Sequence, residues 1–277
     1  DKVFKNRISI ANPLFSETGC LRNNLWEEHI AICKRNINAG QTGCWIFEIG
    51  SIYLQEKEQI REQKLISGAI TGNRTFGKWQ ESTKKDSIDY YEGRGLLASV
   101  FKSLNLNVSD QDLNEDPLFH PGKASKLILE GKLLGKFGQF HPTLSEKFGL
   151  SKSIYLFEID LELMLIATNR KGKLVTKYQP FPTVPTMERD ISLLLDKNIR
   201  CADLIDIIRK AGKPYLEKVE LIDRYEGNGL PEGKISQAFR IIYRSKKNTL
   251  TEQEIEPIQE HIMKQLKSKL DIELRSS

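Results

Sequence analysis

Hydrophobic and polar positions follow one pattern up to about residue 177 and a different one after it. In residues 191–195 an apolar side chain recurs at every second position, the period of a β-strand with one buried face. Three prolines in the segment 180–185 fix φ and remove backbone donors, so no helix can run through that segment. The pattern therefore predicts a boundary, with one unit over residues 1–177 and a smaller one over residues 178–277.

The first unit mixes helical and strand periodicity. Apolar residues within 21–38 recur at helical spacing, whereas 44–54 and 64–72 have the composition of strands, joined by a charged connection over 56–64. The same reasoning predicts a short strand at 8–14, a helix at 88–104, a turn at 119–122, a hairpin within 124–140 that turns at 130–132, and a strand within 153–165 followed by the start of a helix. Long antiparallel strands favour an α+β domain built on one sheet.

The second unit has the element order of a ferredoxin-like fold. After its first strand the pattern predicts a helix over 201–211, strands over 215–225 and 234–244, a helix from Thr251 to about Ser268 and a last strand over 271–275. Thr251-Glu-Gln-Glu254 forms a capping box for the second helix. The order βαββαβ is the split βαβ arrangement, with the first and third strands central and both helices on one face.

The composition of the chain indicates a cellular location but does not indicate a function. The net charge of +5 is spread over both units of the 277-residue chain, so charge alone does not argue for nucleic acid. Cys20, Cys33, Cys44 and Cys201 have neither zinc nor redox spacing, which predicts reduced thiols and a cytoplasmic location. No apolar run approaches the roughly 20 residues of a membrane span. The missing initiator Met suggests a piece of a longer protein.

The histidines, glycine-rich segments and acidic residues that could form a metal or phosphate site are better explained as parts of turns, strands and loops. His120 and His141 each precede a proline and have no second ligand at metal spacing, so we expect turn histidines and no metal site. The glycines of 131–138 and of Gly93-Arg-Gly95 do not form a phosphate loop. The acidic residues between 110 and 116 lack a calcium-loop pattern and predict a solvated loop.

A family resemblance appears in the order of several short motifs. Asn12-Pro13, Phe47-Glu-Ile-Gly50, Phe119-His-Pro-Gly122 and Phe157-Glu-Ile-Asp160 lie in the sequence as they do in the catalytic-like domain of phenylalanyl-tRNA synthetase β subunits, which the chain resembles over most of residues 8–165. The resemblance implies a class II synthetase-like antiparallel sheet for residues 1–177.

The resemblance also implies that this domain is catalytically inactive. In active class II synthetases, an arginine at a fixed distance after the Phe-Glu-Ile-Gly strand binds the α-phosphate of ATP, and here that position holds Leu54. Leucine cannot make such a charge-assisted contact. The Gly-x-Asp-Arg of motif 3 is also missing after Phe157. We therefore expect no catalytic residue in this chain, with ATP, magnesium and phenylalanine bound by the α subunit.

The second unit resembles the ferredoxin-fold anticodon-binding domain that ends the same β subunit. The motifs are Leu221-Ile-Asp-Arg-Tyr-Glu-Gly227, Leu230-Pro-Glu-Gly-Lys234 and Glu273-Leu-Arg275. If Leu193 and its alternating neighbours face the helices, the open sheet face shows arginines and serines and no aromatic residue. The RNA-binding candidates on this face and the loop after it are Arg224, Arg240, Arg244, Lys246 and Lys247.

Together these features predict a C-terminal portion of a phenylalanine–tRNA ligase β subunit. It would support the α subunit in an α2β2 heterotetramer, bind the anticodon region of tRNA(Phe) and have no membrane association. One rival is a self-sufficient class II amino-acid-activating enzyme, which would need arginine in place of Leu54. Another rival is a ferredoxin-like sensor, for which the cysteine spacing supplies no ligands.

Overall fold

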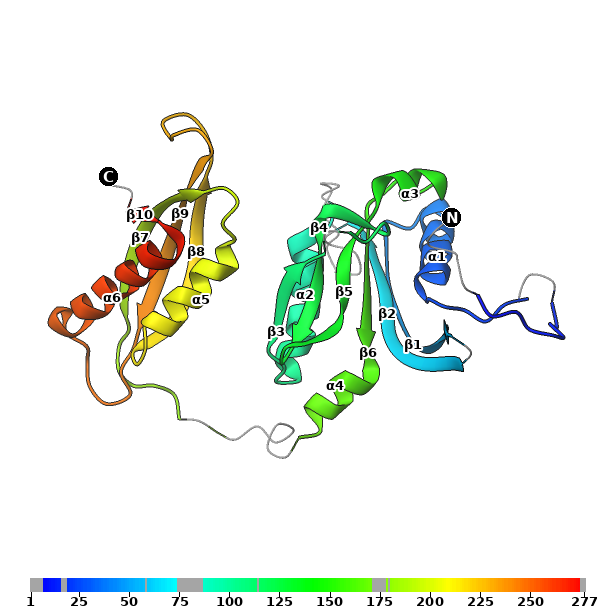
Figure 1. Cartoon of the computed structure of the whole chain (residues 1–277), viewed down its shortest axis with the longest axis horizontal. Helices are drawn as coiled ribbons and strands as arrows, with labels where there is room; N and C mark the ends of the chain where they lie inside the picture. Colours follow the sequence, from blue (N-terminus) through cyan, green and yellow to red (C-terminus); the bar gives the residue numbers. More distant parts are fainter. Residues whose placement is uncertain are drawn as a thin grey trace. The chain divides into compact units, whose positions relative to one another are not determined.

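The computed structural model shows two compact units, Asp1–Lys177 and Tyr178–Ser277, each with its own core (Figure 1). The structure describes residues 7–15, 19–57, 59–73, 87–113, 115–170, 178 and 180–274. Within this part of the chain, no helix is long and apolar enough to cross a membrane.

The first unit is built on a six-stranded antiparallel sheet (Figure 1). In the order of the sheet, the strands are β1 (Gly43–Glu56), β2 (Gln59–Gly72), β6 (Ile154–Asp160), β5 (Lys132–Phe140), β4 (Phe119–Leu129) and β3 (Val108–Asp112). Each strand pairs with its neighbour in antiparallel register. The expected sheet of antiparallel strands is therefore present.

Helices cover both faces of this sheet because side chains alternate along its central strands. Leu156 of β6 is buried in a cluster with α1 (Trp26–Asn38), whereas Phe157 packs in a second cluster with α2 (Tyr90–Ser103). A capping box between Asp89 and Glu92 starts α2. Two short helices, α3 (Pro142–Lys147) and α4 (Leu161–Thr168), follow β5 and β6 respectively.

Three local predictions for this unit were wrong. The connection expected over 56–64 is mostly strand, because β1 and β2 pair as far as Glu56 opposite Gln59. This part of the hairpin is largely exposed on both faces, so it carries no hydrophobic alternation. The turn expected at 119–122 is the irregular start of β4, where the register shifts between Phe119 and Ala124. The strand expected at 8–14 is reduced to an isolated bridge between Ser9 and Cys20.

Sequence reasoning also missed two elements of this unit. The acidic run was expected to form a loop, but Asp110 and Asp112 lie on β3, whose exposed residues carry no apolar periodicity. The helix α3 was not predicted, because it is short and has no buried residue. In contrast, the hairpin turn at 130–132 was correct, and Glu130 and Gly131 both have positive φ, at 52° and 79°.

The second unit is a four-stranded antiparallel sheet with two helices on one face (Figure 1). Its strand order is β10 (Glu273–Leu274), β7 (Met187–Asp196), β9 (Lys234–Tyr243) and β8 (Leu216–Tyr225). The helices are α5 (Cys201–Ala211) and α6 (Glu252–Leu270), and the predicted capping box at Thr251 is present. The ferredoxin-like order with β7 and β9 at the centre is as predicted.

Candidate functional site

The two faces of the second sheet differ in what covers them. Leu193 and Leu195 of β7 and Phe239 and Ile241 of β9 are fully buried in the core beneath α5 and α6. The residues between them point to the opposite, open face, where the hydroxyl oxygens of Ser192 and Ser236 lie 3.3 Å apart. The central strands therefore present the face that the alternation predicted.

A β-bulge in β8 changes which of its side chains reach this open face. Leu221 is opposite Phe239 and Asp223 is opposite Ala238, so β8 contains one extra residue between these pairs. As a result, Arg224 is opposite Gln237, on the face that the helices cover, and Tyr225 is opposite Ser236 on the open face. The placement of Arg224 on the open face was wrong, and so was the expectation that this face has no aromatic residue.

Tyr225 stands at the edge of the open face beside the loop that joins β8 to β9. Its side chain is 41% exposed, and its hydroxyl donates a hydrogen bond of 2.8 Å to the carbonyl of Asn228. A Cβ atom on Gly227 would lie 3.1 Å from the Tyr225 hydroxyl, so a glycine leaves room for the ring. The ring is therefore held at one end and accessible to a planar ligand.

Arg240 lies on the open face, but carboxylates occupy its guanidinium. Nε and Nη2 donate to the two carboxylate oxygens of Asp190 at 2.9 and 2.8 Å, and Glu188 lies 3.7 Å away. The hydrogen bonds from Arg240 lower the pKa of Asp190. An RNA phosphate would have to compete with this bidentate pair.

Arg244 joins two backbone segments. Its guanidinium forms an ion pair with Glu217 and donates a hydrogen bond of 3.2 Å to the carbonyl of Val184. Arg244 thereby ties the segment before β7 to the start of β8. Lys246 and Lys247 follow in an exposed turn, in which the buried Ser245 hydroxyl accepts from the Lys247 N–H at 3.2 Å.

The five candidate cations are spread along the length of the sheet. Arg224 is opposite Gln237, and Arg244 follows Gln237 by seven residues, which corresponds to about 23 Å of extended chain. The structure therefore does not bring Arg224 together with Arg244, Lys246 and Lys247. Sequence reasoning placed the three arginines on one open face and the two lysines in the loop beyond its edge, and it missed the bulge that moves Arg224 to the other face.

Leu54 is the residue that the family resemblance aligns with the ATP-binding arginine of active class II enzymes. Leu54 lies on β1 opposite Arg61 and packs against the buried cluster of Leu25, Ile52 and Leu65. This packing favours leucine and leaves no guanidinium at that position. At the motif 3 position, Asp160 caps α4 by accepting the Leu163 N–H at 2.8 Å.

The same sheet face carries a cavity of about 190 Å³, lined in part by Ile52, Leu65, Glu158 and Asp160. Among the lining residues only Lys136 is basic, and its ammonium is held by Asp116 at 2.6 Å. Such a surface does not fit a triphosphate. Among the described residues there is also no group of three or more His, Cys, Asp or Glu side chains that could hold a metal ion.

Glu158 is the most unusual carboxyl group in this cavity. Its Oε1 is enclosed and has no hydrogen-bond partner in the described part of the chain. Burial raises the pKa of Glu158, and the nearby Lys136 only partly opposes this effect. Because the folded state binds the proton more tightly than the unfolded state, this group costs stability as the pH rises above the ordinary glutamate pKa.

We therefore expect Glu158→Gln to stabilise the first unit at pH 8 by up to about 1 kcal/mol, since it removes a charge with an unpaired buried oxygen. The gain should shrink as the pH falls toward the ordinary glutamate pKa, where the parent carboxyl is also protonated. Urea unfolding at several pH values measures this difference. Glu162→Gln, at an exposed position of α4, is the control. A gain that does not change with pH would contradict the assignment.

Comparison with known proteins identifies both units. Residues 1–161 match the sequence model of the phenylalanyl tRNA synthetase beta chain CLM domain. The chain belongs to the phenylalanyl-tRNA synthetase β-chain family. Residues 182–275 match the ferredoxin-fold anticodon binding domain, so the second resemblance is also confirmed.

Curated relatives of this synthetase family match the whole chain. A phenylalanine–tRNA ligase beta subunit of Prochlorococcus marinus (strain SARG) is 50% identical over 276 residues, covering 100% of this chain and 33% of that protein. The corresponding subunit of Synechococcus sp. (strain CC9902) is 48% identical over 270 residues, covering 98% of this chain and 34% of that protein. The chain thus spans about a third of the length of the curated relatives it matches. Neither rival function is favoured by these matches.

Proposed function

We propose that this chain acts within a phenylalanine–tRNA ligase, with residues 178–277 contacting the anticodon of tRNA(Phe) and residues 1–177 supporting a catalytic α subunit. The observation that carries the proposal is the match of both units, in this order, to the synthetase β-chain and anticodon-binding families. The assembly would be an α2β2 heterotetramer in the cytoplasm. ATP, magnesium and phenylalanine would bind the α subunit, because Leu54 leaves no phosphate-binding arginine here.

The anticodon contact is proposed for the hairpin end of the open sheet face. Tyr225 offers an exposed ring for stacking on an unpaired base, as single-stranded RNA recognition commonly requires. Asp223 is exposed on the same face and would hydrogen-bond to a base edge. Arg224, which pairs with Glu226 at 2.8 Å and is nearly half exposed, would contact a flanking phosphate.

The other candidate cations have weaker roles in this proposal. Arg240 and Arg244 hold the sheet and its preceding segment through carboxylates and a backbone carbonyl. Lys246 and Lys247 are exposed at the far end of β9 and would contact RNA only outside the bases read at Tyr225.

The apolar side chains of the edge strand β1 support the proposed role of the first unit. Phe47 and Ile49 are two residues apart, so they lie on one face, and they are 72% and 58% exposed. Large apolar side chains on an edge strand are typical of a surface that another protein covers. The α subunit is the partner that we propose for this surface.

A pyrophosphate-exchange assay tests whether this chain is catalytically active without the α subunit. We expect this chain alone to show no phenylalanine-dependent exchange between ATP and pyrophosphate, because Leu54 cannot stabilise the adenylate transition state. The α subunit mixed with its full-length β subunit is the positive control. Exchange by a sample of this chain free of α subunit would refute the non-catalytic assignment and favour the self-sufficient enzyme.

A further inference from the structure

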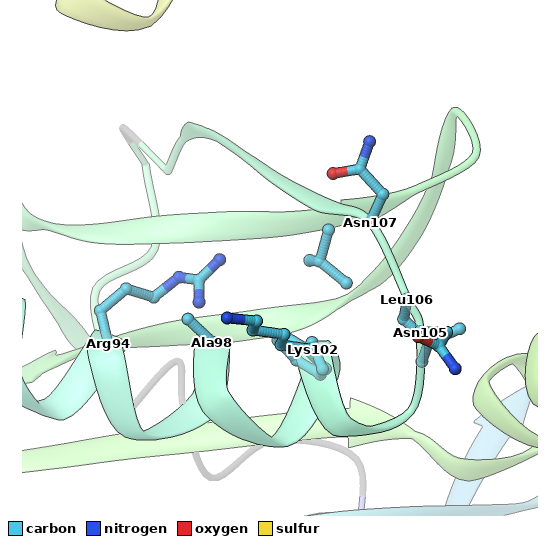
Figure 2. A pocket seen from close by; sticks show the side chains of 8 residues that line it. Arg94, Ala98, Lys102, Asn105, Leu106 and Asn107 are labelled. Atoms are coloured by element: carbon cyan, nitrogen blue, oxygen red, sulfur yellow. The ribbon is translucent and has the colours of Figure 1, made fainter. Parts of the chain in front are cut away.

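A cavity of about 330 Å³ lies between α2 and β3 in the first unit (Figure 2). Polar and basic side chains form much of its wall, and the lining residues are Arg94, Ala98, Phe101, Lys102, Asn105, Leu106, Asn107 and Val108. Arg94, Ala98 and Lys102 are spaced by four residues and so lie along one side of α2. The small Ala98 leaves space between the two cationic side chains (Figure 2).

A hydrogen-bond network fixes the guanidinium of Arg94 in this wall. Nε and Nη2 donate to the two carboxylate oxygens of Asp110, each at 2.8 Å. Asp110 also accepts from the Ser125 hydroxyl at 2.7 Å, and the Tyr90 hydroxyl lies 3.2 Å from Ser125. The guanidinium carbon lies 5.7 Å from the centre of the Phe101 ring. Arg94 is therefore held in one orientation before any ligand arrives.

One nitrogen of this fixed guanidinium is unused. Arg94 Nη1 is enclosed and has no hydrogen-bond partner among the described residues. A buried donor without an acceptor costs free energy that a suitable ligand would recover. Figure 2 shows the ammonium of Lys102 directed back along the helix toward Arg94, whereas the amide of Asn107 points away from this helix. Two cations and one carboxylate leave a local excess of positive charge.

We propose that this cavity binds a phosphate group, either of a small phosphate ester or of an RNA backbone. Nη1 of Arg94 and the ammonium of Lys102 would donate to its oxygens. The phosphate oxygens would give Arg94 Nη1 the acceptor that it lacks, in the charge-assisted geometry that arginine favours. The Gly93-Arg-Gly95 segment lies within a helix. It would therefore contribute an arginine side chain to the site and would not form a glycine-rich phosphate loop.

Phosphate binding to the full chain can be measured by calorimetry at constant ionic strength, with inorganic phosphate and adenosine 5′-monophosphate as probes. We expect saturable binding that weakens about tenfold in Lys102→Gln and in Arg94→Lys, since each removes one charge-assisted contact. Lys102 is exposed, so its variant should fold even if the Arg94 variant does not. Arg61→Gln is the matched control, because Arg61 is also paired with a carboxylate, Glu56 at 3.1 Å, on a different part of the sheet.

A single-stranded RNA without terminal phosphates distinguishes the two sources of phosphate. Binding of the two small probes alone would support a small phosphate ester. RNA binding that Lys102→Gln weakens and inorganic phosphate displaces would support a backbone phosphate. No saturable binding of any probe up to about 10 mM, or equal affinities of the parent chain and Lys102→Gln, would overturn the proposal.

Discussion

Replacing Tyr225 with alanine should weaken binding of the tRNA(Phe) anticodon stem-loop by about tenfold or more, which is the loss expected when one base loses its aromatic stacking partner. The ring is 41% exposed and lies on the open sheet face opposite Ser236. Binding is measured by titrating the stem-loop with the full chain at fixed salt and recording the fluorescence anisotropy of the stem-loop.

Tyr225→Phe is the matched control because it keeps the ring and loses only the hydrogen bond to Asn228. We expect it to bind nearly as tightly as the parent chain. A second comparison uses Lys246→Gln, at the far end of β9, which should reduce the salt dependence of binding without changing base preference. If Tyr225→Ala binds like the parent and Lys246→Gln loses affinity, the anticodon site lies at the other end of the sheet.

The sequence predicted the order of elements in the second unit well because its periodicity comes from burial. The helix at 201–211 and the strand starting at 234 coincide with observed boundaries, since the apolar residues that recur at regular spacing there face the core. The β1–β2 hairpin shows the opposite case. Its end is exposed on both faces, so nothing in the composition of residues 59–64 distinguishes a strand from a loop.

The candidate site was predicted less well because a single inserted residue reverses the faces of a strand. Continuing the alternation from Val219 through β8 places Arg224 on the open face, but the bulge between Leu221 and Asp223 puts Tyr225 there instead. A bulge leaves little trace in hydrophobicity when it occurs on an exposed edge strand. The glycine two residues after Tyr225 was the available signal, because it makes room for an aromatic ring.

The ion pairs of the candidate arginines also could not be predicted from the sequence. Asp190 is opposite Arg240 only because of the register between β7 and β9, and Glu217 meets Arg244 only because β8 begins beside the end of β9. Counting basic residues therefore overstated the cations available to RNA. The position of Leu54 came from the family resemblance, and the structure adds that this side chain packs against the cluster that contains Leu25.

Replacing Gly135 with alanine should strongly destabilise the first unit. A Cβ atom at this position would lie 2.0 Å from the carbonyl oxygen of Glu158 and 2.9 Å from the Cα of Ile159. These are backbone atoms of the neighbouring strand β6, so no side chain can rotate away, and β5 and β6 must separate. Because these strands are at the centre of the sheet, we expect a loss of stability of about 3 kcal/mol or more, as for other overpacked cores. Chemical denaturation of the full chain measures it.

Gly95→Ala is the control, since a Cβ at Gly95 meets no atom within 4 Å and lies in the interior of α2. It should stabilise the chain by about 0.5–1 kcal/mol, as alanine favours helix over glycine. The pair of variants also separates the two proposed functions. Gly135→Ala should abolish complex formation with the α subunit on co-expression, while anticodon stem-loop binding by the second unit, which has its own core, is retained. Loss of stem-loop binding in Gly135→Ala would show that RNA recognition depends on the first unit as well.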